Sequence, residues 1–164
     1  MNNMQRIMRT MAVAIALFAV GFAAPAFAQD AHIGTWKGDI AKSTFSPAPT
    51  GPAPSSATRT YEMFGNGLKN TLTTVSADGK STTTAYSAHF DGKDYPYTGS
   101  QNFDTIALKR IDASTFTSEI KKAGKVVSTV RNTVSPDGKT MTIAIKGTNA
   151  QGQPTSSVTV FEKQ

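Results

Sequence analysis

The sequence predicts an all-β fold, an antiparallel up-and-down meander closed into a β-barrel of about 8–10 strands. Asp-Gly turns recur along the chain, most clearly as SPDGKT at 135–140, ADGK at 77–80 and DGKD at 91–94. The segments between them alternate apolar and polar residues, as half-buried strands do. Residues 29–164 also contain 22 Thr and 14 Ser, a composition that favours strands over helices.

Residues 1–28 are expected to be a signal peptide. Arg6 and Arg9 precede an apolar run over 11–24, and Ala26-Phe27-Ala28 resembles a cleavage site before Gln29. A membrane anchor is the alternative, but the run is short for a bilayer. The prediction is therefore a periplasmic or secreted protein whose single domain covers residues 29–164.

The turns set the order of the strands. Gly accepts the positive φ that tight hairpins require, and Asp tolerates the same corner. Turn centres are expected near Asn66, Gly79, Gly92, Ala113, Gly124, Gly138 and Gly152. Nine main strands are expected near 33–38, 58–64, 68–76, 81–90, 103–111, 115–122, 126–135, 140–147 and 155–163, with a corner or a short extra strand within 95–100.

One apolar face on every strand, with no helix to cover it, requires a sheet that closes on itself or folds into a sandwich. Closure of a meander into a barrel also removes its exposed edges. A membrane barrel would reverse the faces and carry aromatic girdles. The Thr, Ser and Lys face has none, so after cleavage we expect a chain that does not span a membrane.

The segment 42–56, KSTFSPAPTGPAPSS, is expected to be a Pro-rich loop because four prolines oppose regular pairing. It is either a solvated connection or a lid over the barrel mouth with Phe45 tucked in.

Gly34-x-Trp36 on the first strand resembles the N-terminal motif of lipocalins and their calycin relatives. The strings GTWKGDIAKSTFSPAP (34–49), DGKDYPYTGS (91–100) and LKRIDASTF (108–116) are similar to a family of uncharacterised exported bacterial lipocalin-like proteins. The resemblance implies a barrel closed at one end by Trp36. This chain departs from the family pattern at its last strand, which offers Lys163 where the relatives usually pack an Arg on the Trp.

Catalytic groups are scarce in this sequence. There is no cysteine, which excludes thiolate nucleophiles and Cys-based metal sites. His32, expected at a fraying N-terminus, and His89, expected outside, form neither a metal site nor a triad. The aspartates fall at turns, where they are solvated. We therefore expect no enzyme, no metal and no cofactor.

Ligand binding is easier to motivate. A barrel of this size is either filled by side chains or able to hold one small molecule. The predicted function is binding of a small apolar or amphipathic ligand, which implies a small hydrophobic partner; a packed core is the alternative interior. The expected ligand-binding residues are Tyr61, Met63, Tyr86, Phe116 and Asn132.

A second hypothesis is an envelope interaction or inhibitor module without catalysis. It would contact an envelope protein through loop tips such as residues 93–97, which carry two tyrosines and a proline. Nucleic acid is not an expected partner, because the net charge falls from +6 to +4 once Arg6 and Arg9 are removed, and the remaining lysines are spread over the turns.

Overall fold

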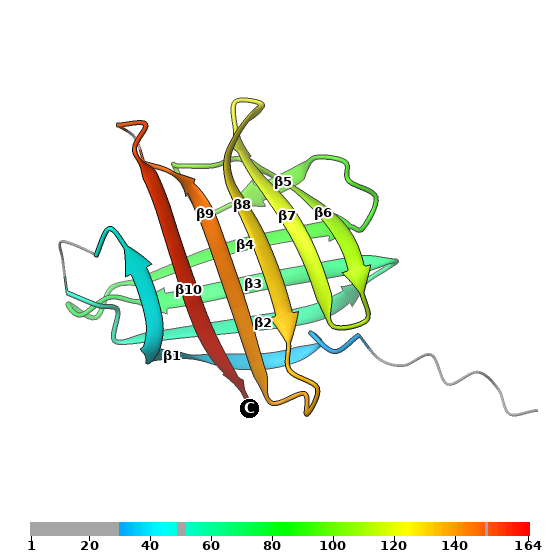
Figure 1. The fold of residues 1–164 in the computed structure, drawn as a ribbon, viewed down its shortest axis with the longest axis horizontal. Coiled ribbons are helices and arrows are strands. Elements are labelled where there is room, and N and C mark those ends of the chain that lie inside the picture. The colour runs from blue at the N-terminus through cyan, green and yellow to red at the C-terminus, as the bar shows by residue number, and fades with distance from the viewer. Residues whose placement is uncertain (1–29, 49–51, 150) are drawn as a thin grey trace, which may run out of the picture.

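The computed structural model describes residues 30–48, 52–149 and 151–164. The expected signal peptide and residues 49–51 of the Pro-rich segment lie outside this part of the chain. The described residues form ten antiparallel strands in one closed barrel (Figure 1). The strands are β1 (Gly34–Ser46), β2 (Ser56–Phe64), β3 (Gly67–Val75), β4 (Ser81–His89), β5 (Tyr95–Thr98), β6 (Thr105–Asp112), β7 (Thr115–Lys122), β8 (Lys125–Val134), β9 (Thr140–Thr148) and β10 (Pro154–Lys163).

The barrel is an up-and-down meander, which confirms the predicted fold class. Each strand pairs with its neighbour in sequence, and β1 pairs with both β2 and β10 to close the ring. In Figure 1, strands β6–β10 run steeply across the front while β2–β4 cross behind them, so the barrel is flattened into two crossing layers. The short extra strand is β5, joined to β4 and β6 by only two residue pairs on each side.

The first strand is longer than predicted. β1 continues to Ser46, with Thr44, Phe45 and Ser46 paired to β10, so the expected loop over 42–56 begins only at Pro47. The register shifts between Asp39 and Thr44, where β1 turns from one layer to the other. Pairing persists here because proline removes a backbone donor only from position 47 onward.

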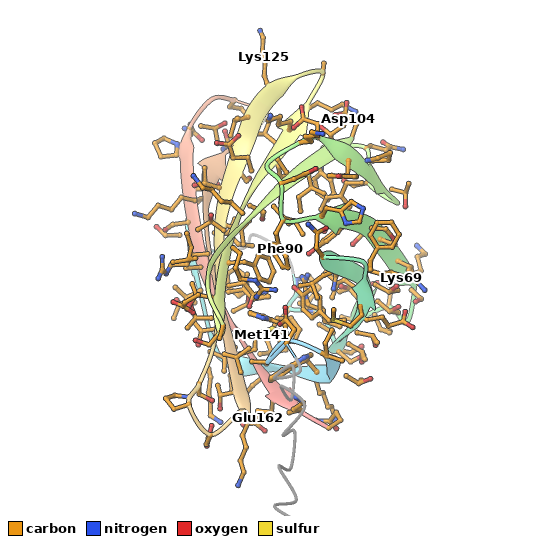
Figure 2. All side chains as sticks on the ribbon, turned by 90° about the vertical axis from the view of Figure 1, so that its right-hand side faces the viewer. Lys69, Phe90, Asp104, Lys125, Met141 and Glu162 are labelled. Carbon is orange, nitrogen blue, oxygen red and sulfur yellow. The ribbon has the colours of Figure 1, made fainter. Side chains whose placement is uncertain are left out.

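The apolar core lies between the two layers. Trp36, Leu68, Leu108 and Met141 are fully buried, and Phe90 and Met141 point into the space between the layers in Figure 2. The opposite faces carry the Thr, Ser and Lys residues of the alternation. Burial of this inward face is the main favourable term holding the sheet closed. Across 30–48, 52–149 and 151–164 we find no helix with the length and apolar character needed to cross a membrane.

Candidate ligand-binding site

A cavity of about 250 Å³ lies inside the barrel. This volume is near the lower end of the range of small-molecule pockets, ~300–1,000 Å³, and suits one small ligand. Most of its wall is apolar, with a few polar side chains among the hydrophobic ones, which suits small-molecule binding. The aliphatic and phenyl part of the wall is formed by Leu72, Phe103, Ile106, Phe116, Ile120, Val130, Ile143 and Ile145.

The register between neighbouring strands brings several polar side chains together on the inner face of the sheet. On β2 to β5, Tyr61 is opposite Asn70, Asn70 opposite Tyr86, and Tyr86 opposite Tyr97, which makes one inward row. All four residues are buried. Because residues directly opposite share a face of the sheet, the hydroxyl and amide groups gather at one level of the barrel.

Arg59 lines the cavity, although it was not among the residues predicted from the sequence. It lies two residues before Tyr61, so it has the same inward direction. Its NH1 donates to Asn70 Oδ1 at 3.0 Å and to the Tyr61 hydroxyl at 3.4 Å. Its buried Nε has no hydrogen-bond partner. The Arg59 side chain is half-buried, and its guanidinium carbon lies 5.4 Å from the centroid of the Phe161 ring and 5.9 Å from that of the Tyr61 ring. No carboxylate pairs with Arg59 among the described residues.

The charge state of this group follows from its surroundings. Burial acts to lower the pKa of Arg59, but at the high pH where Tyr61, Tyr97 and Tyr86 ionise, their negative charge outweighs burial and raises that pKa. Burial raises the pKa of Tyr61, which Arg59 offsets only in part, and burial together with Tyr61 raises the pKa of Tyr86 well above its usual range. At neutral pH the cavity therefore holds one guanidinium and neutral phenols.

Four of the five residues predicted to bind a ligand line this cavity: Tyr61, Tyr86, Phe116 and Asn132. Their contact with a ligand stays a prediction. Met63 was wrongly placed in the interior, since its side chain is 59% exposed. It has the parity of Tyr61, but it stands one residue before the end of β2, where the strand extends past the closed part of the barrel.

A second cavity of about 230 Å³ continues the first toward β1 and β10. Arg59, Leu72 and Ile145 line both cavities and form the partition between them. Phe45 lines the second cavity and also a surface hollow of about 350 Å³ beside Pro47 and Ala48. Its side chain is 41% exposed, so Phe45 stands at the rim of the second cavity and is not tucked into the barrel as the lid hypothesis had it.

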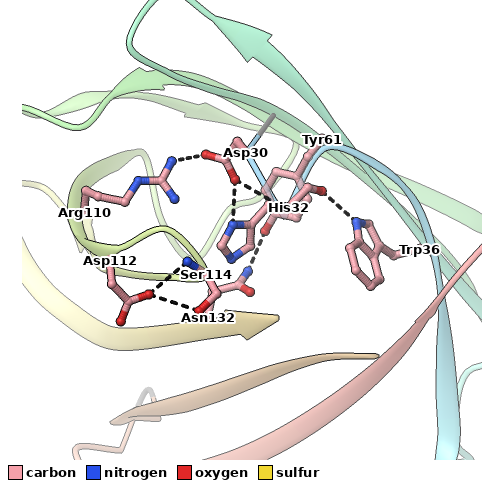
Figure 3. A network of polar contacts seen from close by, with 8 residues as sticks. All are labelled: Asp30, His32, Trp36, Tyr61, Arg110, Asp112, Ser114 and Asn132. Carbon is pink, nitrogen blue, oxygen red and sulfur yellow. Dashed lines mark hydrogen bonds and ion pairs between the residues drawn. The ribbon is translucent and has the colours of Figure 1, made fainter. Parts of the chain in front are cut away.

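The N-terminal turn closes another part of the barrel (Figure 3). The backbone N–H of His32 donates to Asp30 Oδ1 at 3.0 Å, and His32 Nδ1 lies 2.9 Å from the same oxygen. Asp30 Oδ2 pairs with Arg110, whose guanidinium carbon lies 3.7 Å from the centroid of the Phe90 ring. Burial alone would raise the pKa of Asp30, but hydrogen bonds from His32 and Arg110 lower it to about 2.

His32 does not fray as the sequence analysis expected. Its side chain is fully buried, with the ring centroid 4.7 Å from that of Phe116. Its carbonyl accepts a 2.8 Å hydrogen bond from Trp36 Nε1, which ties the turn to the buried indole. Lys163 Nζ lies 5.0 Å from the centre of the indole ring, so Lys163 supplies a cation on Trp36 at the place where the sequence departs from the Arg of the lipocalin motif.

The loop over 93–97, proposed as a contact surface, exposes less aromatic surface than the sequence suggested. Tyr97 is buried against Tyr86 and Phe103, and Tyr95 is half-buried, so of the two tyrosines and the proline only Pro96 is exposed. Tyr95 packs edge-on to His89, which stacks on Phe64 with ring centroids 4.8 Å apart. His89 is half-buried in this aromatic stack. Within the described ranges, no three His, Asp or Glu side chains are grouped to hold a metal ion.

In the part of the chain that the structure describes, the fold and the site define an antiparallel β-barrel with a mainly apolar cavity lined by an arginine, Arg59, that has no carboxylate partner there. No protein-family model matches the chain, and a search of the curated proteins finds no match. Among solved structures, the chain is similar to the zebrafish ileal bile acid-binding protein complexed with cholic acid, at 11% identity and a TM-score of 0.46. The alignment covers 82% of this chain and 99% of that one. A likeness at this TM-score carries no argument about the ligand.

Proposed function

We propose that this chain is an exported, lipocalin-like barrel that binds a small amphipathic acid inside its cavity, without catalysis. The apolar wall would take the hydrocarbon part of the ligand, and Arg59 would take the acidic group. Export is supported by the apolar segment over 11–24 and the Ala26-Phe27-Ala28 site, and lipocalin likeness by Gly34-x-Trp36.

The observation that carries this proposal is the unpaired guanidinium of Arg59. Arg59 is half-buried, and a charge partly withdrawn from water is costly unless an opposite charge or sufficient hydrogen bonds compensate it. Here Asn70 and Tyr61 satisfy one nitrogen, while Nε has no partner. A ligand carboxylate would supply both the missing charge and the missing acceptor, and charge-assisted bonds to guanidinium are the strong ones.

The test uses decanoate as the acid and 1-decanol as its neutral counterpart, measured by isothermal titration calorimetry on the folded domain. The Arg59→Met variant is expected to bind decanoate about 10–100-fold more weakly, because a hydrogen bond to a charged group contributes about 1.5–3 kcal/mol. Its affinity for 1-decanol is expected to change by less than about 3-fold, since the alcohol carries no charge.

Arg131→Met is the matched control, because Arg131 is an exposed arginine on β8 whose side chain lies outside the cavity. It is expected to leave decanoate affinity at the wild-type value. The proposal is wrong if the wild-type barrel binds no decanoate, or if the Arg59 and Arg131 variants lose decanoate affinity equally.

A further inference from the structure

The cavity contains a second unpaired group besides Arg59. Asn132 on β8 is 1% exposed and lines the cavity. Its Nδ2 donates to the Tyr61 hydroxyl at 2.8 Å, while its Oδ1 is buried without any hydrogen-bond partner among the described residues. Buried side-chain oxygens without a donor are few in native proteins, because the oxygen has given up its water.

Asn70 shows what a fully bonded amide looks like in the same barrel. It is also fully buried, yet its Oδ1 accepts from Arg59 at 3.0 Å and its Nδ2 donates to the Thr60 carbonyl at 3.3 Å. Both ends of this amide are therefore used by the protein. The difference between the two amides indicates that Asn132 Oδ1 is left for a donor that comes from outside the chain.

The two unpaired groups lie close together. Arg59 NH1 and Asn132 Nδ2 both contact the same oxygen, that of Tyr61, at 3.4 and 2.8 Å. These nitrogens can be no further apart than the two contacts laid end to end. The unpaired atoms themselves are Arg59 Nε and Asn132 Oδ1, and because their side chains meet at this one oxygen, a single small ligand can reach both. Thr84 Oγ1 also faces the cavity without a partner. A hydroxyl can both donate and accept, so Thr84 would pair with either a donor or an acceptor on the ligand.

We propose that the ligand is a hydroxy acid with an apolar tail, in which the hydroxyl stands a few atoms from the carboxylate. The carboxylate accepts from Arg59, the hydroxyl donates to Asn132 Oδ1, and the tail lies against the aliphatic wall around Leu72 and Ile145. This inference rests on the proposed function and narrows its ligand class. It adds a requirement for a donor, which Arg59 alone does not impose.

Calorimetry with decanoate and with the two enantiomers of 3-hydroxydecanoate tests this inference. At least one enantiomer is expected to bind the wild-type barrel about 10-fold more tightly than decanoate, the size of one buried hydrogen bond. In the Asn132→Leu variant, which keeps a similar volume, the two acids are expected to bind equally. In the Asn70→Leu variant both acids are expected to weaken together while the 10-fold preference remains.

Asn132→Leu also removes the hydrogen bond to Tyr61 and could therefore weaken folding. A change in the ligand, with the wild-type protein kept, avoids this problem. 3-Methoxydecanoate has an oxygen at the same position but no donor, and it is expected to bind wild type no more tightly than decanoate. Equal affinity for decanoate and both hydroxy acids would overturn the inference, because Asn132 Oδ1 would then have another donor such as water. The proposed function would still stand. A preference that survives Asn132→Leu, or is matched by the methoxy acid, would overturn it as well. Failure of all the acids to bind would overturn the proposed function too.

Discussion

Replacing Asp30 by Asn is expected to remove a pH-dependent part of the stability of the barrel. Asp30 has a side chain only 9% exposed, and it joins His32 to Arg110 where the N-terminal turn packs on the barrel. Its pKa is about 2 in the folded chain against an ordinary value of 3.8. At about 1.36 kcal/mol per pKa unit, this difference contributes about 2 kcal/mol to the free energy of unfolding.

The sign follows from which state holds the proton. The folded state binds a proton at Asp30 less readily than the unfolded state, so the contribution is present above the unfolded pKa of 3.8. It is lost as the pH falls through that value toward about 2. The stability gap between wild type and Asp30→Asn is therefore expected to be widest near pH 5 and to narrow steadily below pH 4.

Urea unfolding followed by tryptophan fluorescence measures the gap directly, because Trp36 is the single tryptophan and is fully buried. Curves at pH 5, 4, 3 and 2.5 give the free energy of unfolding of each protein. Glu62→Gln is the control, since Glu62 is 56% exposed in its pair with Lys69, and such surface pairs contribute little. A wild-type to Asp30→Asn gap that stays constant from pH 5 to pH 2.5 would refute the assignment of Asp30 as a buried, paired carboxylate.

Two further predictions concern packing and turns. Phe116→Ala is expected to cost about 3–5 kcal/mol in urea unfolding, because Phe116 is 2% exposed. Met63→Ala is expected to cost less than about 0.5 kcal/mol, because the Met63 side chain is 59% exposed. Equal costs would contradict the exposed orientation of Met63. Gly99→Ala and Gly79→Ala both place a side chain at positive φ, but only at Gly99 would the new Cβ meet the Thr83 carbonyl oxygen, at 2.0 Å. Gly99→Ala is thus expected to cost about 1–3 kcal/mol more than Gly79→Ala in thermal unfolding, and a smaller loss at Gly99 would show that the β5–β6 connection relaxes freely.

Much of the barrel was predictable because hairpin turns and strand alternation are local. The Asp-Gly corners at Gly79, Gly92 and Gly138 have positive φ as the turn chemistry requires, and all nine main strands are present. Trp36 is buried as the lipocalin-like motif implied. These features depend on residues a few positions apart, which a single sequence displays.

The errors have physical causes that can be named. Arg59 was missed although its parity with Tyr61 pointed inward, because a charged residue is ordinarily assigned to the outside. His32 was assigned to a fraying end, since the residues that hold the turn lie about eighty residues away along the chain: Phe116 packs on the His32 ring, and Arg110 pairs with Asp30. Met63 was assigned to the interior because alternation specifies a face of the strand but not how far the barrel extends along it.

The order and pairing of the strands and the burial of Trp36 follow from short-range patterns that can be read in the sequence. Only the tertiary structure decided that the interior holds a cavity and that Arg59, Tyr61 and Asn132 meet within it. A void is the difference between the volume enclosed by all ten strands and the volume of the side chains that fill it. That difference depends on every register and bulge in the ring, so no local pattern of residues determines it.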